Sequence, residues 1–233
     1  MTEIKKFEPK AIFRTAFNKA LQAQQPLAEK YVARLRRVHP EKSPEQLISY
    51  INKWFLSTVA GTGAAAGTSA VVPNGVVQIP VAIAELTAYT QASVLYVLSV
   101  AEVQNLHLED IEKRRLLVSS ALLGGAAAEK IISKAVGPVA KHWGKTLVAA
   151  FSRDAIKTIN KVLGPRFMTI TGSKMGVLVL GKQAPLMIGA GLGATLNVLF
   201  ASGVIKATKM IMGPAPKAWP ENESATKTKT VRK

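Results

Sequence analysis

The chain has 233 residues, of which 48% are hydrophobic, and it carries a formal net charge of +17 with no cysteine. The absence of cysteine excludes disulfides, thiolate catalysis and any zinc site with a cysteine ligand. The length fits one large domain or two small ones. Because the opening residues MTEIKKFEPKAIF carry charges throughout, we expect no secretory signal peptide there.

Charge is divided unevenly along the chain. Residues 54–112 contain five acidic residues and no lysine or arginine, and residues 183–205 contain no charged residue. The basic residues gather in the three blocks that flank these apolar ones. Bases beside apolar segments are typical of membrane proteins, whereas nucleic-acid binders more often interleave bases with aromatic residues. The pattern therefore favours a membrane partner and makes a nucleic-acid partner the weaker hypothesis.

Three helices are predicted before the first apolar block. The first covers residues 9–24, and the second begins at Pro26 and ends before Pro40. A third begins at Ser43-Pro44, where Ser43 caps the helix, Pro44 takes its first position and Gln46 completes a capping box.

The central apolar block predicts a helical hairpin. Helices over 54–72 and 80–103 are each about long enough to cross a bilayer, with a turn at residues 73–75. Gly63 and Gly67 form a small-xxx-small pair that lets two helices approach closely. A membrane hairpin and a soluble pair of helices rich in Gly and Ala both fit this pattern.

One polar stripe runs along the second helix of this hairpin, and it includes Glu85, Tyr89 and Tyr96. A buried carboxyl group is either protonated or paired with another polar group. We interpret Glu85 as making a structural hydrogen bond to a tyrosine or a lysine. The alternative is that the stripe lines an apolar cavity in which Glu85 relays a proton or contacts a ligand.

Basic helices follow the central block. Residues 105–109 break the chain, the next helix ends at Gly124-Gly125, and another stops at Gly137. A helix from Pro138 then closes at Gly164-Pro165. Five bases share one row on it and are candidates for binding an anionic lipid surface: Lys141, Lys145, Arg153, Lys157 and Lys161. A solvated face of an ordinary bundle helix explains the same row.

The last third of the chain is less regular. Residues 166–182 fit either two strands or a broken helix. The uncharged run 183–205 follows and contains a second small-xxx-small pair, Gly189 and Gly193. Because bases flank this run on both sides, we expect it to be re-entrant or to pack against the central hairpin. The segment GPAPKAWP ends the helix, and residues 214–233 are interpreted as a disordered basic tail.

Chemical motifs are largely missing from the sequence. Gly144-Lys145-Thr146 matches the end of a phosphate-binding loop, but such a loop needs glycine at position 139, which is Val139. The three histidines are scattered without metal-ligand spacing. We therefore expect no metal, no cofactor and no catalytic residue, and the sequence favours a non-enzymatic protein.

At the level of whole segments the sequence resembles the EcsC family, especially its actinobacterial branch. The resemblance rests on the run from Gly67 to Gly125, on residues 166–200 and on the closing MGPAPKAWP. It covers roughly residues 54–219, and many members have His-Gly where this chain has Gln104-Asn105. The biochemical function of the family is unknown, so the resemblance implies membrane association and gives no catalytic residues.

These observations predict an all-α protein of seven or eight helices in a single bundle, with an apolar core rich in Gly and Ala and flanking basic amphipathic helices. We divide it into basic N-terminal helices (1–53), an EcsC-like helical domain (54–213) and the tail (214–233). The expected partner is an anionic phospholipid membrane, together with a membrane protein as a further candidate. The expected location is the cytoplasmic side of a bacterial membrane, with the cytoplasm as the alternative. The competing functions are a soluble module that binds a protein or nucleic acid through its basic face, and a lipid carrier or enzyme with an apolar cavity.

Overall fold

The computed structural model describes residues 8–69, 75–106, 108–180 and 189–219. Over these ranges the chain forms eight α-helices and no strand, which confirms the all-α prediction. The helices are α1 (Pro9–Val38), α2 (Pro44–Ser69), α3 (Gly75–Val103), α4 (Ile111–Leu123), α5 (Gly125–Val136), α6 (Trp143–Ala150), α7 (Arg153–Leu180) and α8 (Gly189–Met212).

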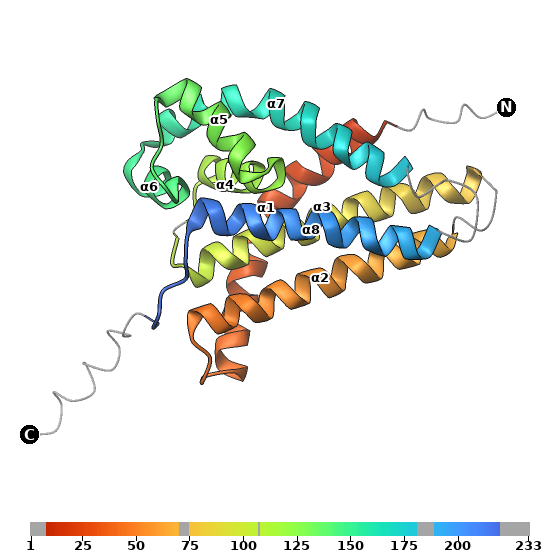
Figure 1. The fold of residues 1–233 in the computed structure, drawn as a ribbon, viewed down its shortest axis with the longest axis horizontal. Helices are drawn as coiled ribbons and strands as arrows, with labels where there is room; N and C mark the ends of the chain where they lie inside the picture. The colour runs from red at the N-terminus through yellow and green to blue at the C-terminus, as the bar shows by residue number, and fades with distance from the viewer. Residues whose placement is uncertain (1–7, 70–74, 107, 181–188, 220–233) are drawn as a thin grey trace, which may run out of the picture.

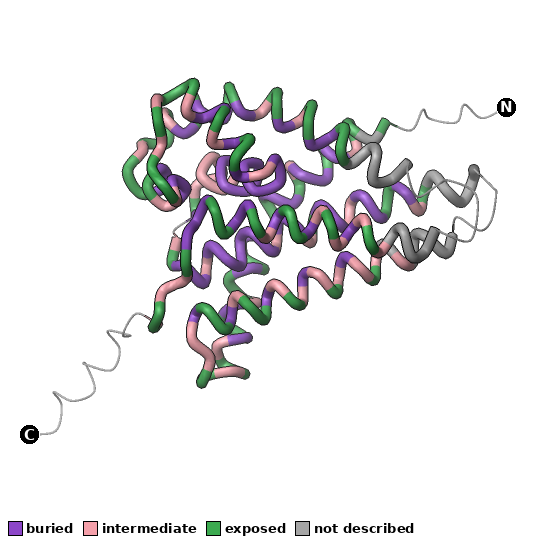
Figure 2. Tube along the Cα trace, viewed as in Figure 1, coloured by how far each residue is buried: buried purple, intermediate pink, exposed green. Residues whose placement is uncertain are grey.

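The helices form one bundle with α3 near its centre. In Figure 1, α2, α3 and α8 run side by side, α1 crosses α3, and α4 to α7 cover one side of this group. Buried hydrophobic residues from α1 to α8 form a continuous core, and Figure 2 shows the buried positions on the faces that the helices turn toward one another. The boundary that we placed at residue 53 falls inside α2, and core residues lie on both sides of it.

Several helix ends lie where local sequence signals placed them. The amide of Ser43 donates to Gln46 Oε1 at 2.9 Å and the amide of Gln46 donates to Ser43 Oγ at 3.3 Å, which is the predicted capping box. Asp110 accepts hydrogen bonds from two amides of the first turn of α4. Gly124 and Gly137 end α4 and α5 with positive φ angles of 102° and 84°, a conformation that favours glycine.

The predicted boundaries at three prolines are wrong. Pro26 lies inside α1, Pro165 lies inside α7, and Pro80 lies inside α3, which begins at Gly75, so none of the three begins or ends a helix. All three prolines are exposed, while residues on other faces of the same helices are buried in the core, such as Ala28 in α1 and Phe167 in α7. Packing of the buried face thus outweighs the backbone hydrogen bond that each proline removes.

The long basic helix predicted from Pro138 to Gly164 is also wrong. Residues 138–142 are not helical, α6 is short, and Phe151 adopts an extended conformation (φ −93°, ψ 138°) before α7 begins. Ser152 Oγ accepts a hydrogen bond from the amide of Ala155 at 3.3 Å and so caps the start of α7. The cap at Ser152 therefore separates α6 from α7, which the helical periodicity of the sequence had predicted to be one helix.

Residues 166–180 and 189–212 of the C-terminal third are helical. Residues 166–182 were predicted to form either two strands or a broken helix. Their described part, residues 166–180, continues α7 to its end at Leu180. Helix α8 runs past Lys206, where we ended the apolar run, to Met212, and Gly213 ends it with a φ of 75°. Residues 181–188, which include the start of that run, and residues 70–74, which include two of the three residues of the predicted turn, lie outside the described residues. The third, Gly75, is the first residue of α3.

The first residues of the segment that we assigned to the tail pack against the bundle. The indole Nε1 of Trp219 donates a hydrogen bond to the carbonyl of Lys42 at 2.9 Å. The guanidinium carbon of Arg36 lies 4.1 Å from the centre of the Trp219 ring, within the range of a cation–π contact. The remainder of the tail, residues 220–233, lies outside the described residues.

Candidate functional site

The five bases predicted to bind a lipid surface do not share one row. Lys141 lies in the turn before α6 and Lys145 lies on α6, whereas Arg153, Lys157 and Lys161 lie on α7. The break at Phe151 and Ser152 separates the two groups, so the two groups have different neighbours.

The α7 group lies on an exposed face that mixes bases with apolar side chains. Arg153 Nε is 2.9 Å from Asp110 Oδ2, and Lys157 and Lys161 extend into solvent beside it. Further along the helix, 41% of Val162 and 39% of Ile170 are exposed. Two more exposed bases, Arg166 and Lys174, follow on α7. This composition suits contact with a surface that is both anionic and apolar.

The other group joins bases that are far apart in the sequence. Lys141 lines a pocket of ≈ 290 Å³ together with Lys206 and Lys209 of α8. We call this the lysine pocket; its remaining lining residues are Glu129, His142, Trp143 and Met210. Three lysines face one glutamate, so the pocket carries an excess of positive charge that favours anions.

Lys145 lies beside the lysine pocket without lining it. Its Nζ donates a hydrogen bond to the carbonyl of Pro214 at 3.4 Å. Partial burial holds the pKa of Lys145 below its ordinary value, because desolvation disfavours the charged ammonium. This lysine therefore supports the segment after α8 in addition to adding positive charge.

Close approach of α6 to α8 brings the lysine pocket together. A Cβ on Gly144 would collide with the side chain of Ile211, and a Cβ on Gly213 would lie 2.7 Å from the ring of His142. His142 has a φ of 59°, and its Nδ1 is 3.1 Å from the carbonyl oxygen of Met210. The two glycines thus let Lys141 reach the same pocket as the lysines of α8.

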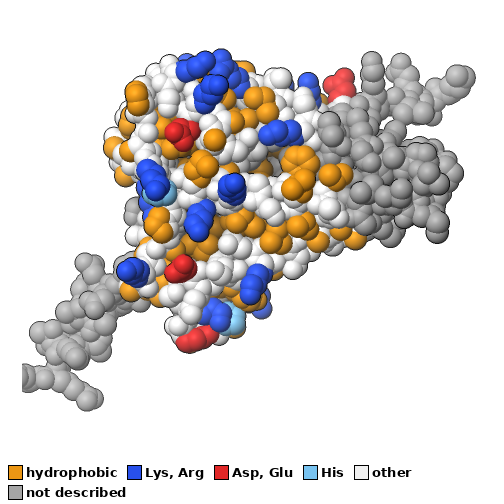
Figure 3. Space-filling view, in the orientation of Figure 1, with side chains coloured by type: hydrophobic (Ala, Val, Ile, Leu, Met, Phe, Trp, Pro, Cys, Tyr) orange, Lys and Arg blue, Asp and Glu red, His pale blue; other side chains and the backbone are white. Residues whose placement is uncertain are grey.

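The surface around α8 shows the same mixture of charge and apolar area. Figure 3 shows lysine and arginine side chains distributed among hydrophobic ones on this face, with few acidic side chains between them. Leu199 of α8 is 65% exposed and Met210 is 37% exposed, close to Lys206 and Lys209 in the sequence. An anionic lipid surface offers partners for both kinds of side chain.

The predicted cavity stripe is buried inside the bundle. Asn197 Nδ2 donates to Glu85 Oε1 at 3.2 Å and to the carbonyl of Val59 at 2.8 Å. Tyr96 donates to Asn52 Oδ1 at 2.8 Å and stacks on Phe55 with ring centres 4.5 Å apart. Tyr89 is 1% exposed. Neither the lysine pocket nor a second pocket between α1, α4 and α7 is lined by Glu85, Tyr89 or Tyr96. The contacts of Glu85 and Tyr96 favour the structural interpretation, and Asn197 is one hydrogen-bond partner of Glu85.

The four glycines predicted to pack helices lie on the two helices that pair. Gly63 and Gly67 belong to α2, Gly189 and Gly193 belong to α8, and α2 packs along α8. The surroundings of these glycines lie outside the described residues, so their contact stays a prediction.

One helix among the described residues, Pro80–Val103, is long and apolar enough to span a membrane, and 56% of its most apolar window is buried in the bundle. The described part of α2 contains no second such segment, and residues 70–72 of the predicted first span lie outside the described ranges. Of the two helices of the predicted hairpin, α3 alone therefore meets the length and composition of a membrane span within the described residues.

Sequence reasoning missed Lys206, Lys209, His142 and Trp143 as parts of one site. Lys206 was interpreted as the end of an apolar run, and nothing local in the sequence connects it to Lys141. Only the close packing of α6 on α8 places them together.

Comparisons of the chain with protein-family models, with curated proteins and with solved structures found no match. The resemblance to the EcsC family therefore stays a prediction.

Proposed function

We propose that this protein binds the anionic surface of a bacterial membrane from the cytoplasmic side, as a non-enzymatic peripheral protein. The observation that carries the proposal is the lysine pocket, where Lys141, Lys206 and Lys209 meet beside the exposed side chain of Met210. Each base near an anionic membrane contributes on the order of 1 kcal/mol to binding. The exposed bases and apolar residues of α7 supply a second contact to the same surface.

The test measures binding to vesicles that contain phosphatidylglycerol, with pure phosphatidylcholine vesicles as the uncharged reference. Replacing Lys141, Lys206 and Lys209 together with glutamine should weaken binding about 100-fold, the equivalent of about 3 kcal/mol. The matched control replaces Lys30, Arg34 and Arg37 on the exposed side of α1, which removes the same charge from another place. The control should retain most of the binding.

Two outcomes would count against this function. Equal losses in the two triple variants would mean that the total charge matters and the lysine pocket does not. Binding of nucleic acid at physiological salt that is tighter than binding to anionic vesicles would favour the alternative partner, and that binding would itself fall steeply with salt.

A further inference from the structure

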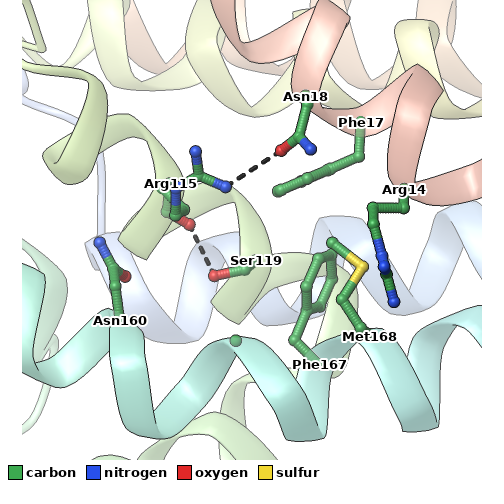
Figure 4. A pocket seen from close by; sticks show the side chains of 9 residues that line it. Arg14, Phe17, Asn18, Arg115, Ser119, Asn160, Phe167 and Met168 are labelled. Atoms are coloured by element: carbon green, nitrogen blue, oxygen red, sulfur yellow. Dashed lines mark hydrogen bonds between the residues drawn. The ribbon is translucent and has the colours of Figure 1, made fainter.

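A second pocket lies on the bundle between α1, α4 and α7, and the membrane proposal does not use it. Its volume is ≈ 250 Å³. Figure 4 shows a polar end around Arg115 and Asn18 and an apolar end around Phe17, Phe167 and Met168. The lining residues are Arg14, Phe17, Asn18, Arg115, Ser119, Asn160, Gly164, Phe167 and Met168, and no acidic residue is among them.

The guanidinium at the polar end is held in place from two sides. Arg115 Nη1 donates to Asn18 Oδ1 at 3.1 Å, and Arg115 Nε lies 3.8 Å from Glu112 Oε2. Asn160 Nδ2 fixes Glu112 by donating to its backbone carbonyl at 2.9 Å and to Oε2 at 2.8 Å. These contacts leave Arg115 Nη2 and Asn18 Nδ2 as donors without a partner among the described residues. The donors are therefore positioned before any ligand binds.

The apolar end is built from aromatic rings and one methionine. The ring centres of Phe17 and Phe167 are 4.7 Å apart, and both side chains are fully buried. Met168 lies beside them and is partly exposed, so its unbranched side chain can adapt to a bound group. Arg14 lies on the far side of these residues from Arg115 and has no hydrogen bond or ion pair with any described residue.

Charge and size narrow the class of ligand. Two guanidinium groups and the carboxylate of Glu112 sum to one positive charge, which suits a monoanion better than a dianion. A guanidinium beside an amide donor matches the planar geometry of a carboxylate. The volume is below the roughly 300 to 1,000 Å³ that is typical of sites for drug-sized ligands. The ligand is therefore compact.

We propose that this pocket binds a small monocarboxylate with a compact apolar body, such as an aromatic ring or a short alkyl chain. The carboxylate accepts hydrogen bonds from Arg115 and Asn18, and the apolar body contacts Phe17, Phe167 and Met168. Arg14 at the rim attracts the anion without direct contact.

The test uses the full chain with ¹³C-labelled methionine methyl groups, titrated with phenylacetate and, separately, with its uncharged analogue phenylacetamide. The methyl resonance of Met168 should shift and saturate with a Kd on the order of 1 mM, as expected for a ligand of about ten heavy atoms. Phenylacetamide should bind at least about 10-fold more weakly, because it lacks the charge that strengthens the hydrogen bonds to Arg115. The resonance of Met212, fully buried at the end of α8, is the internal control and should not move.

Two variants test the two ends of the pocket separately. Arg115→Gln should weaken phenylacetate binding about 10-fold or more and weaken phenylacetamide binding much less, because only the carboxylate loses a charge-assisted hydrogen bond. Met168→Trp fills the apolar end, leaves Arg115 in place and should abolish binding of both ligands, measured by saturation transfer to the ligand. Equal affinity for phenylacetate and phenylacetamide, or a Met168 resonance that never moves, would overturn the proposal. Binding of Arg115→Gln to anionic vesicles should match that of the unmodified chain, so the two proposals fail independently.

Discussion

Asn197 connects three helices through one side-chain amide. Its Nδ2 donates to the carbonyl of Val59 in α2 and to the carboxylate of Glu85 in α3, and the side chain is fully buried in α8. An unpaired polar group at such a position would lose its hydration without compensation. Asn197 therefore allows a carboxylate to lie deep in an apolar bundle.

Replacing Asn197 with leucine should lower the free energy of unfolding by about 1 to 3 kcal/mol, because it removes a buried donor that bonds both Glu85 and the carbonyl of Val59. Glu85→Gln retains an acceptor oxygen and should cost less. Urea denaturation measures both. Leu199→Ala, two residues away on the exposed side of α8, is the control and should change stability by less than about 0.5 kcal/mol. A cost for Asn197→Leu no larger than that of the control would mean that these hydrogen bonds contribute nothing to stability.

Gly144 provides a test of how closely α6 approaches α8. A Cβ there would meet the side chain of Ile211, and its carbonyl oxygen at 3.0 Å, so Gly144→Ala should destabilise the protein by about 1 to 3 kcal/mol through overpacking. Gly203→Ala is the matched helical control, since nothing lies within 4 Å of its Cβ position. That control should stabilise the protein by up to about 1 kcal/mol. The reverse order of stability would contradict the close approach of α6 to α8.

The sequence predicted that Glu85 would need a partner, but it could not identify that partner. A carboxylate inside an uncharged run has to be neutralised or paired wherever the run is buried. Which residue pairs with it depends on the packing of α3 against α8, 112 positions away. The same limit applies to Lys206 and Lys209, because only the tertiary packing of α6 against α8 brings them close to Lys141.

At the scale of the helices, local capping signals were reliable and proline was not. Ser43, Gly124 and Gly213 mark ends that the structure confirms, because each satisfies backbone groups of its own turn. Local sequence signals also predicted that Gly164-Pro165 would end a helix, but Pro165 lies inside α7. The buried residues on both sides of it, which include Phe167 in the aromatic cluster with Phe17, hold the helix together instead.

Pro165→Ala should therefore stabilise the protein. Proline in a helix interior costs about 3 kcal/mol relative to alanine, and proline offsets about 1 kcal/mol of this by restricting the unfolded chain. The expected gain is about 2 kcal/mol, measured by thermal or urea unfolding. Pro44→Ala is the control at the first position of α2, where no intrahelical hydrogen bond is lost to proline, and it should bring no gain. A destabilised Pro165→Ala would mean that the packing of α7 requires the proline ring itself.

At the scale of the whole molecule, the net charge of +17 and the buried position of α3 favour attachment by surface charge. Binding through surface lysines should weaken as salt rises, because the Debye length falls from about 10 Å at 0.1 M to about 3 Å at 1 M. Washing bacterial membranes with 1 M NaCl should release the protein, as detected by immunoblotting of the pellet and the supernatant. Protein that stays in the pellet after both salt and carbonate washes would place Pro80–Val103 in the bilayer and contradict peripheral binding.

The pairing of α2 with α8 also affects how the chain is synthesised. The ribosome completes α2 at residue 69 but does not finish its partner until residue 212, so the face of α2 that α8 covers stays open while more than half of the chain is translated. Exposed apolar surface on a nascent chain promotes aggregation and recruits chaperones. A chain that stops at residue 188, without α8, should pellet as aggregate after translation in a chaperone-free extract. A chain that stops at residue 219, which retains α8 and Trp219, should remain in the supernatant, and equal pelleting of the two would show that α8 is not the helix that completes folding.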